Sequence, residues 1–310
     1  MNGSARALDV LACPSCGNGL ASPAGVGEGA CVSCRNPYRM ENSILSWGNP
    51  LDKISDPSRK LSSLVLRQFN PLGSRLSPLR HITDFRINQY YRRSLSDRSL
   101  AEAWGRHNLQ GLNLQPGAMV LDHGCGRGRH SAFLSNLGFQ VAAQDIQVNF
   151  WWRKLRQCVF QSVPASAPRL PWKDGTFALV YDFAVIHYMS EKQLSAFVAE
   201  VFRVLAPGGY WLLAEPNDES YGAPTMRRAI GRLHSLAHTR ETVAQCGFQE
   251  VDLSYEGFFA PAFPLYVDFL RKILNPSPLD VSDFESTIAA RIAPRRRKHW
   301  RLRLQKPGSA

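Results

Sequence analysis

Three glycines at alternate positions, Gly124, Gly126 and Gly128, follow a short apolar run and precede a helix-like segment. Glycine lets the backbone turn sharply and approach a ligand closely, and the N-terminus of the following helix offers unpaired N–H groups. Asp145 ends the next strand-like run, 21 residues after Gly124. An acid at about that distance can accept hydrogen bonds from a pair of ribose hydroxyls. The combination predicts a site for a ligand that contains a nucleoside.

The details of this turn separate two such ligands. The glycine spacing is G-x-G-x-G, whereas a dinucleotide fingerprint reads G-x-G-x-x-G, and Asp122 stands just before the turn. A cationic sulfonium ligand has no pyrophosphate, so a nearby acid costs it little. The pattern therefore favours S-adenosylmethionine over a nicotinamide dinucleotide.

Four of the seven cysteines form two C-x2-C pairs near the N-terminus, Cys13 with Cys16 and Cys31 with Cys34. This spacing is typical of a tetrahedral zinc site with four thiolate ligands. Two structural disulfides are the alternative, but a reducing compartment and C-x2-C pairs favour the metal. No further ligand or activating base is evident, so the predicted Zn²⁺ is structural. The other cysteines are expected to be small buried apolar residues: Cys125, Cys158 and Cys246.

Strand-like and helix-like segments alternate from residue 118 onward. The expected strands are 118–122, 140–144, 177–183, 210–214, 249–255 and 300–305. The expected helices are 86–109, 131–137, 191–205 and 239–246, the last with Thr239 as its cap. Such alternation predicts an α/β fold with a doubly wound, mostly parallel sheet covered on both faces.

Three motifs in this order resemble those of class I S-adenosylmethionine-dependent methyltransferases of the ubiquinone/menaquinone-biosynthesis type. They are Val120-Leu121-Asp122-x-Gly124-Cys125-Gly126-x-Gly128, Leu170-Pro171-Trp172-x-Asp174-Gly175-x-Phe177, and Arg203-Val204-Leu205-x-Pro207-Gly208-Gly209. The resemblance covers residues 118–215 well and 239–306 loosely. It implies a Rossmann-like methyltransferase fold with a seven-stranded sheet.

The resemblance also implies a set of cofactor-binding residues. They are Asp122, Gly124, Cys125, Gly126, Gly128, Asp145, Ile146, Ser166, Ala167 and Phe183. Asp145 would take the ribose hydroxyls. Ser166 and Ala167 stand where the family usually carries an acid for the adenine amino group, which leaves that contact open.

His187 is the candidate general base, because it follows strand 177–183 near the edge where such sheets bind ligands. A hydroxyl acceptor usually needs a base, whereas a carbon, nitrogen or sulfur nucleophile can react without one. The alternative is a helix-capping or partly buried structural histidine. Other side chains are expected to shape the site or lie at its rim or on the surface: His123, Tyr181, Tyr188, His234 and His238.

The chain divides into three predicted parts. Residues 1–48 resemble the small zinc-binding, zinc-ribbon-like heads that are fused to some bacterial methyltransferases. Residues 49–85 form a basic linker with one short helix over 59–69. The methyltransferase domain is expected over 86–310, and its apolar, aromatic-rich segment 257–298 is a candidate for a substrate-shaping insertion.

The net charge of +12 is unevenly distributed. Segment 53–93 carries nine Lys or Arg and two Asp, and segment 291–310 carries eight Lys or Arg and no acid. These flanks are either solvated surface or contacts for nucleic acid, an anionic membrane surface or an acidic substrate. The chain has no run of about 18 apolar residues and no apolar signal near its start, so a cytoplasmic protein is expected.

Three functions compete on these grounds. The leading prediction is methyl transfer from S-adenosylmethionine to oxygen, carbon or nitrogen of a small organic acceptor, aromatic or lipid-like. The alternative is an rRNA or tRNA methyltransferase, which the zinc head and basic flanks favour. The chain lacks an Asn-Pro-Pro-Tyr or nucleophilic Pro-Cys signature in its methyltransferase-like part. A non-catalytic binding protein would predict a degraded glycine turn, and this turn is intact.

Overall fold

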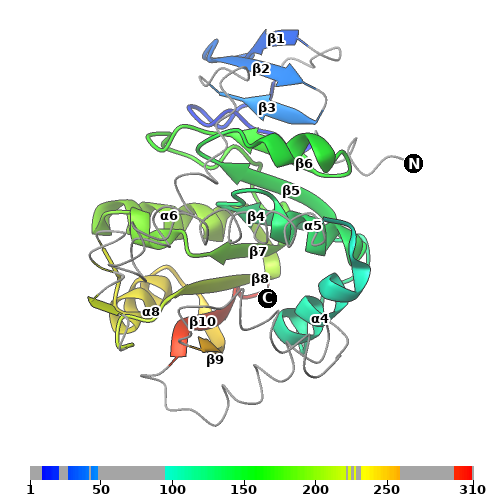
Figure 1. Ribbon diagram of the computed structural model, residues 1–310. Helices are drawn as coiled ribbons and strands as arrows, with labels where there is room; N and C mark the ends of the chain where they lie inside the picture. Colours follow the sequence, from blue (N-terminus) through cyan, green and yellow to red (C-terminus); the bar gives the residue numbers. More distant parts are fainter. Residues whose placement is uncertain are drawn as a thin grey trace, which may run out of the picture.

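Ten strands form one continuous sheet in the computed structural model, in the order β1-β2-β3-β6-β5-β4-β7-β8-β10-β9 (Figure 1). The structure describes residues 9–20, 27–41, 43–47, 95–220, 223–224, 227, 232–258 and 297–308. The predicted linker 49–85 with its helix 59–69, and nearly all of the predicted insertion 257–298, lie outside the described residues.

Seven of the strands make the predicted doubly wound sheet. They are β4 (Met119–His123), β5 (Gln140–Asp145), β6 (Val159–Ser162), β7 (Phe177–Phe183), β8 (Leu205–Pro216), β9 (Gln249–Phe258) and β10 (Arg297–Gln305). The strands from β6 to β8 pair in parallel, and β10 runs antiparallel to both β8 and β9. The predicted fold class is confirmed, although β6 was missing from the expected strands.

The cysteine-rich head supplies the other three strands: β1 (Gly27–Ala30), β2 (Pro37–Glu41) and β3 (Ile44–Ser46). They form an antiparallel meander, and β3 then pairs in parallel with β6, with Leu45 opposite Gln161. The expected count of seven strands is therefore extended to ten. The physical reason is that β6 would otherwise be an open edge, and β3 supplies the missing partners for its backbone groups.

Helices cover both faces of the sheet. Helices α4 (Arg98–Leu109) and α5 (Arg129–Asn136) pack on one face, where Trp104, Ala132 and Leu134 join one apolar cluster. Helices α6 (Glu191–Val204) and α8 (Leu236–Gln245) lie on the other face and add side chains to a second cluster. No helix among the described residues is long and apolar enough to cross a membrane.

The caps of two helices follow from local chemistry. A capping box starts α6, with Ser190 and Gln193 each bonding the other's backbone. Helix α8 begins earlier than expected because Ser235, rather than Thr239, accepts the N-terminal hydrogen bond, from the His238 N–H at 3.1 Å. Thr239 is fully buried inside the helix, and its hydroxyl donates to the Ser235 carbonyl.

The described part of the basic C-terminal segment holds the fold together. Arg301 is 3% exposed and donates to the Asn108 side chain of α4 at 2.5 Å. Arg303 donates to the Gln110 carbonyl at 2.8 Å, and Lys306 donates to the last carbonyls of α6. These three cations therefore bind backbone and side-chain oxygens of the protein itself, and contact of the basic flanks with nucleic acid, a membrane surface or an acidic substrate stays a prediction.

Candidate functional site

The site lies at the carboxyl ends of β4, β5 and β7. The chain leaves β4 for β5 on one side and returns to β7 on the other side, so the strand order reverses at β4. Ligands of open α/β sheets bind at such a switch point. The arrangement brings together the glycine-rich turn after β4, Asp145 at the end of β5, and the turn that follows β7.

The glycine-rich turn needs its glycines for two physical reasons. Gly124, Gly126 and Gly128 all have positive φ, at 63°, 52° and 82°, which other residues rarely adopt. A Cβ on Gly124 would lie 2.3 Å from Cγ2 of Val185, so the turn after β7 packs directly against this glycine. Gly128 is the N-cap of α5. Backbone conformation thus favours glycine at all three positions. Close packing adds to this at Gly124 and Gly128, but an added Cβ at Gly126 would meet no atom within 4 Å.

Asp145 reaches back to the same turn. One carboxylate oxygen accepts a hydrogen bond from the Gly126 N–H at 2.8 Å, and the other accepts from the Ile146 N–H at 2.7 Å. Asp145 is half-buried, and the adjacent Ile146 side chain is 52% exposed. The two elements predicted to share one ligand are therefore in contact, beside an exposed apolar side chain. The ribose contact itself stays a prediction.

Asp122 and Cys125 are both buried around the turn. The Asp122 carboxylate is 1% exposed and accepts a hydrogen bond from the Ser131 hydroxyl of α5 at 2.6 Å. Burial raises the pKa of Asp122 to about 7. The Cys125 N–H donates to the Gln144 carbonyl at 3.0 Å. Both residues brace the turn from inside, and direct contact of their side chains with a cofactor stays a prediction.

A row of polar side chains crosses β4, β7 and β8 below the turn. His123 Nδ1 lies 2.5 Å from one Asp182 oxygen, and the Trp211 indole donates to the other at 2.7 Å. The His123 ring also stacks on Phe197 at 4.5 Å. Burial lowers the pKa of His123, but the Asp182 charge outweighs it and the net shift is upward. His123 shapes the site as expected, while its partners Asp182 and Trp211 escaped sequence reasoning because they are far apart in the chain.

The loop that carries Ser166 and Ala167 connects β6 to the second motif. Ser166 is exposed and Ala167 is half-buried. Downstream, Arg203 donates to the Leu170 and Trp172 carbonyls at 3.0 and 2.8 Å. Arg203 of the third motif thus holds the second motif in place. Whether Ser166 and Ala167 meet adenine stays a prediction.

His187 lies in the short 3-10 helix η3 (Ile186–Tyr188), directly after β7. It is 4% exposed, and its Nδ1 lies 2.8 Å from a carboxylate oxygen of Glu215 at the end of β8. Sequence reasoning missed Glu215; its place at the end of a central parallel strand was the available signal. The neighbouring Tyr188 is 70% exposed, with its ring centroid 4.1 Å from that of His187.

Two other aromatic residues, both on β7, pack against neighbouring rings. Tyr181 is 2% exposed and packs edge-on against Trp104, so it belongs to the core rather than to a pocket wall. Phe183, a predicted cofactor residue, is half-buried between His130 and His299, with ring centroids at 5.4 and 5.1 Å. A contact between Phe183 and the cofactor stays a prediction.

The four head cysteines converge. Their sulfur atoms all lie within 4.8 Å of one another, with Cys13 3.6 Å from Cys34 and Cys16 3.5 Å from Cys31. Sulfurs about 2.3 Å from one tetrahedral zinc are about 3.8 Å apart, and disulfide sulfurs are about 2.05 Å apart. The four thiols are free and fit a metal better than two disulfides. Each pair sits on a turn closed by a backbone hydrogen bond, from Gly17 to Cys13 and from Arg35 to Cys31.

Residues 121–213 match the family model described as a methyltransferase domain. The match begins on β4, ends on β8 and contains the glycine-rich turn, Asp145 and His187. This part of the chain is a methyltransferase domain.

Curated relatives of this methyltransferase domain differ in what they are named for. An uncharacterized methyltransferase of Synechocystis is 33% identical over 34% of this chain and 51% of its own length. A probable tRNA methyltransferase 9B of Homo sapiens is 24% identical over 48% of this chain and 35% of its own. The 2-methyl-6-phytyl-1,4-hydroquinone methyltransferase of Synechocystis is 26% identical over 53% and 57%. The chain thus spans between about a third and somewhat over half of the length of these relatives.

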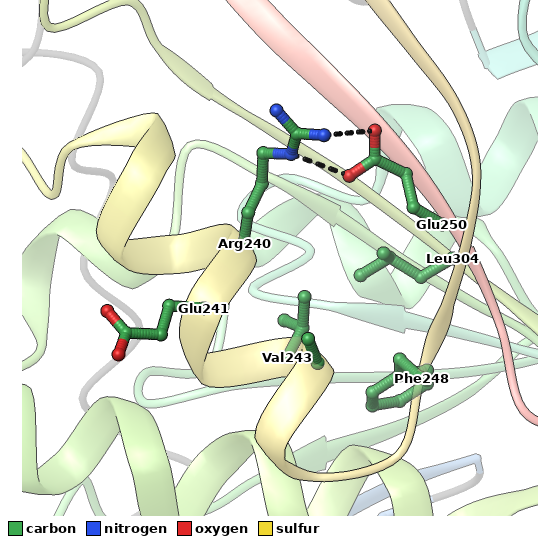
Figure 2. A pocket seen from close by; sticks show the side chains of 7 residues that line it. Arg240, Glu241, Val243, Phe248, Glu250 and Leu304 are labelled. Atoms are coloured by element: carbon green, nitrogen blue, oxygen red, sulfur yellow. Dashed lines mark hydrogen bonds and ion pairs between the residues drawn. The ribbon is translucent and has the colours of Figure 1, made fainter.

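A pocket of about 330 Å³ lies outside the predicted site of the methyltransferase domain (Figure 2). It is lined by residues of α8, β9 and β10 and of the turn before β9, with Val243, Phe248 and Leu304 as its apolar part. Arg240 and Glu250 form an ion pair at 2.7 and 3.0 Å beside it. None of the predicted cofactor-binding residues lines this pocket.

One histidine precedes α8, and another lies in its first turn. His234 is 7% exposed and its Nε2 lies 3.0 Å from the Met189 carbonyl, so it is a buried residue rather than a surface one. His238 is half-buried, and its ring stacks on that of His234 at 6.3 Å.

Proposed function

We propose that this protein transfers the methyl group of S-adenosylmethionine to a small organic acceptor, aromatic or lipid-like, in biosynthesis or secondary metabolism. The observation that carries the proposal is the contact between Asp145 and the Gly126 N–H at the switch point of the sheet. This contact joins the acid that is predicted to bind the ribose to the glycine-rich turn, within the residues that match the methyltransferase family. S-adenosylmethionine supplies an electrophilic methyl group on a sulfonium.

The residues at the switch point fit this cofactor. The positive φ values of the turn present backbone rather than side chains to a ligand, and Asp145 offers its carboxylate to the ribose. The exposed Ile146 would pack against the adenine, with Ser166 and Ala167 on the loop after β6. The enzyme must in addition hold the acceptor close to the methyl group and exclude water.

Two considerations favour a small acceptor. The hydroquinone methyltransferase among the relatives acts on a lipid-like aromatic molecule, as its name states. In addition, Arg301, Arg303 and Lys306 bind protein oxygens, so they are not a free surface for phosphates. Contact with an anionic membrane surface through the basic segment 53–93 would suit a lipid-like acceptor.

An RNA acceptor is the second candidate. One of the relatives is named a probable tRNA methyltransferase, and segment 53–93 carries a net +7. Tritiated-methyl transfer from S-adenosylmethionine to total RNA and to an organic extract separates the two candidates. Label in the organic fraction, resistant to ribonuclease, supports the small acceptor. Label confined to RNA overturns it.

We also propose that Cys13, Cys16, Cys31 and Cys34 hold one structural zinc ion, in a protein of the cytoplasm. The sulfur geometry supports the metal, which binds cysteine in its thiolate form. Elemental analysis of purified protein is expected to find one zinc per chain, lost in Cys13→Ser and kept in Cys158→Ser. Reduced protein that contains no zinc after refolding in its presence would contradict the site.

A further inference from the structure

Glu215 binds the whole turn that follows β7. One of its carboxylate oxygens accepts hydrogen bonds from the Val185 and Ile186 N–H groups, at 2.5 and 2.8 Å. The other lies 2.8 Å from His187 Nδ1. The side chains of Glu215 and His187 are 3% and 4% exposed. A carboxylate only accepts hydrogen bonds, so the proton of a neutral His187 ring is held on Nδ1 and the lone pair on Nε2.

This turn is built against the predicted cofactor site. Ala184, at its start, has φ of 59°, which is unusual for a residue with a side chain. Its N–H donates to the Ala214 carbonyl at 2.8 Å, next to Glu215. Val185 packs on Gly124, so only the absence of a side chain there lets the two turns meet. Strained backbone of this kind persists where neighbouring contacts fix it, and it concentrates at functional sites.

The other nitrogen of His187 has no such partner. Within the described part of the chain, no hydrogen bond is formed by Nε2 of His187. The largely solvent-exposed Tyr188 ring lies beside the His187 ring, with 4.1 Å between the two centroids. A buried imidazole whose Nδ1 is fixed by a carboxylate and whose Nε2 is left for a ligand has the arrangement of a general base.

We infer that His187 is the general base for a hydroxyl acceptor and that Glu215 is its positioning residue; this rests on the methyltransferase function proposed above. The acceptor hydroxyl gives its proton to His187 Nε2, and its oxygen lone pair forms the new bond to the methyl carbon. The carbon–sulfur bond breaks, its electron pair stays on sulfur, and the imidazolium later releases the proton to water. A carbon or sulfur acceptor would not need this pair.

If Glu215 only held the turn in place, its replacement by glutamine would leave the His187 tautomer unchanged. Glu215→Gln keeps an oxygen for the backbone N–H groups, but its amide can donate to Nδ1 and so shift the proton to Nε2. Long-range proton–nitrogen spectra of protein labelled with 15N-histidine report this tautomer directly, with His187→Gln to assign the signal. We expect Nδ1–H in the wild type, a shift toward Nε2–H in Glu215→Gln, and no change in the matched surface variant Glu250→Gln. An unchanged tautomer in Glu215→Gln would overturn the positioning role.

Two further readouts test the base and the acceptor class. An S-adenosylmethionine analogue with an amine in place of the methyl sulfonium is expected to shift the His187 Nε2 signal. S-adenosylhomocysteine is expected to shift that signal less. If calorimetry shows that both ligands bind and neither shifts the signal, His187 is not the base. With the labelled acceptor from the organic extract, Glu215→Gln and His187→Gln are expected to lose at least about 100-fold in kcat with little change in KM. The new methyl group should lie on oxygen, and a methyl on carbon, nitrogen or sulfur overturns the hydroxyl acceptor. Failure to bind S-adenosylmethionine at all would instead overturn the proposed function.

Discussion

The indole nitrogen of Trp47, at the end of the cysteine head, donates a hydrogen bond to the side-chain oxygen of Gln161 on β6, at 2.8 Å. Both residues are buried, at 1% and 0% exposure, and the Gln161 amide donates onward to the Pro171 carbonyl at 3.1 Å. Gln161 on β6 thus connects the cysteine head to the second motif. The head is therefore an integral part of the sheet.

Loss of this contact should destabilise the whole domain. Trp47→Phe keeps most of the apolar area but leaves the Gln161 oxygen without its donor, at a cost of about 1–3 kcal/mol. Urea denaturation followed by far-UV circular dichroism measures this change, and a single transition is expected. Val32→Ala, at a 52% exposed head position, is the control and should be nearly neutral. A transition confined to the head would contradict its integration into the sheet.

The charge of Asp122 should make stability depend on pH. Its pKa of about 7 lies above the ordinary value, so between about pH 4 and pH 7 the folded state binds more protons than the unfolded state. Stability therefore falls as the pH rises through this range. Asp122→Asn, which can still accept from Ser131, removes the buried charge. Because one pKa unit corresponds to about 1.4 kcal/mol, we expect this variant to gain at least about 1 kcal/mol over wild type at pH 8 and little at pH 4.5. Equal differences at the two pH values, from urea titrations, would contradict the assignment.

Arg203 should contribute far more than an ordinary surface arginine. It donates to two main-chain carbonyls and pairs with Glu200 and Asp174, both at 2.6 Å. Arg203→Ala removes the charged donor from all of these acceptors, although the Leu170 carbonyl keeps the Trp172 N–H and Glu200 keeps the Leu170 N–H. The substitution is expected to cost about 2–4 kcal/mol. Arg240→Ala, which removes the exposed pair with Glu250, is the matched control and should cost at most about 1 kcal/mol. Similar losses in both variants would show that Arg203 does not fix the second motif.

The contact of Gly124 with Val185 can be tested by a double mutant. Gly124→Ala introduces a Cβ at 2.3 Å from Val185 and an unfavourable positive φ, so we expect a loss above about 2 kcal/mol and loss of S-adenosylmethionine binding. Gly175→Ala has a similar φ of 61° but no atom within 4 Å of the added Cβ, so it should show the backbone cost alone. Val185→Ala in the Gly124→Ala background should recover part of the stability. No recovery would mean that packing between the two turns is not the limiting contact.

The sequence predicts well those helices and strands that show a clear hydrophobic period or are bounded by glycines. The strand 177–183 was expected with its observed bounds, and the helix 191–205 ends one residue early. Strand β6 was missed because its four residues, VFQS, are all buried and too few to show a period. The pairing of the head with the sheet was missed for a related reason: β3 is short, and its partner β6 lies more than 110 residues away.

The sequence predicted several residues of the site but not which side chains pair with one another. Gly126 and Asp145 were both candidates, and the structure brings them into contact. Glu215 and Asp182, in contrast, belong to apolar strands, and their histidine partners lie 28 and 59 residues away. Side-chain pairing across strands depends on register, which a single sequence does not reveal.

Calorimetric titration of S-adenosylmethionine into the purified protein tests the central claim most directly. One site per chain is expected, with binding weakened at least about 100-fold in Asp145→Ala, since this variant removes a charge-assisted contact to the ribose. The matched variant Asp252→Ala, at an exposed position on β9, should bind as the wild type does. Absence of binding to the wild type, or unchanged affinity in Asp145→Ala, would contradict the account.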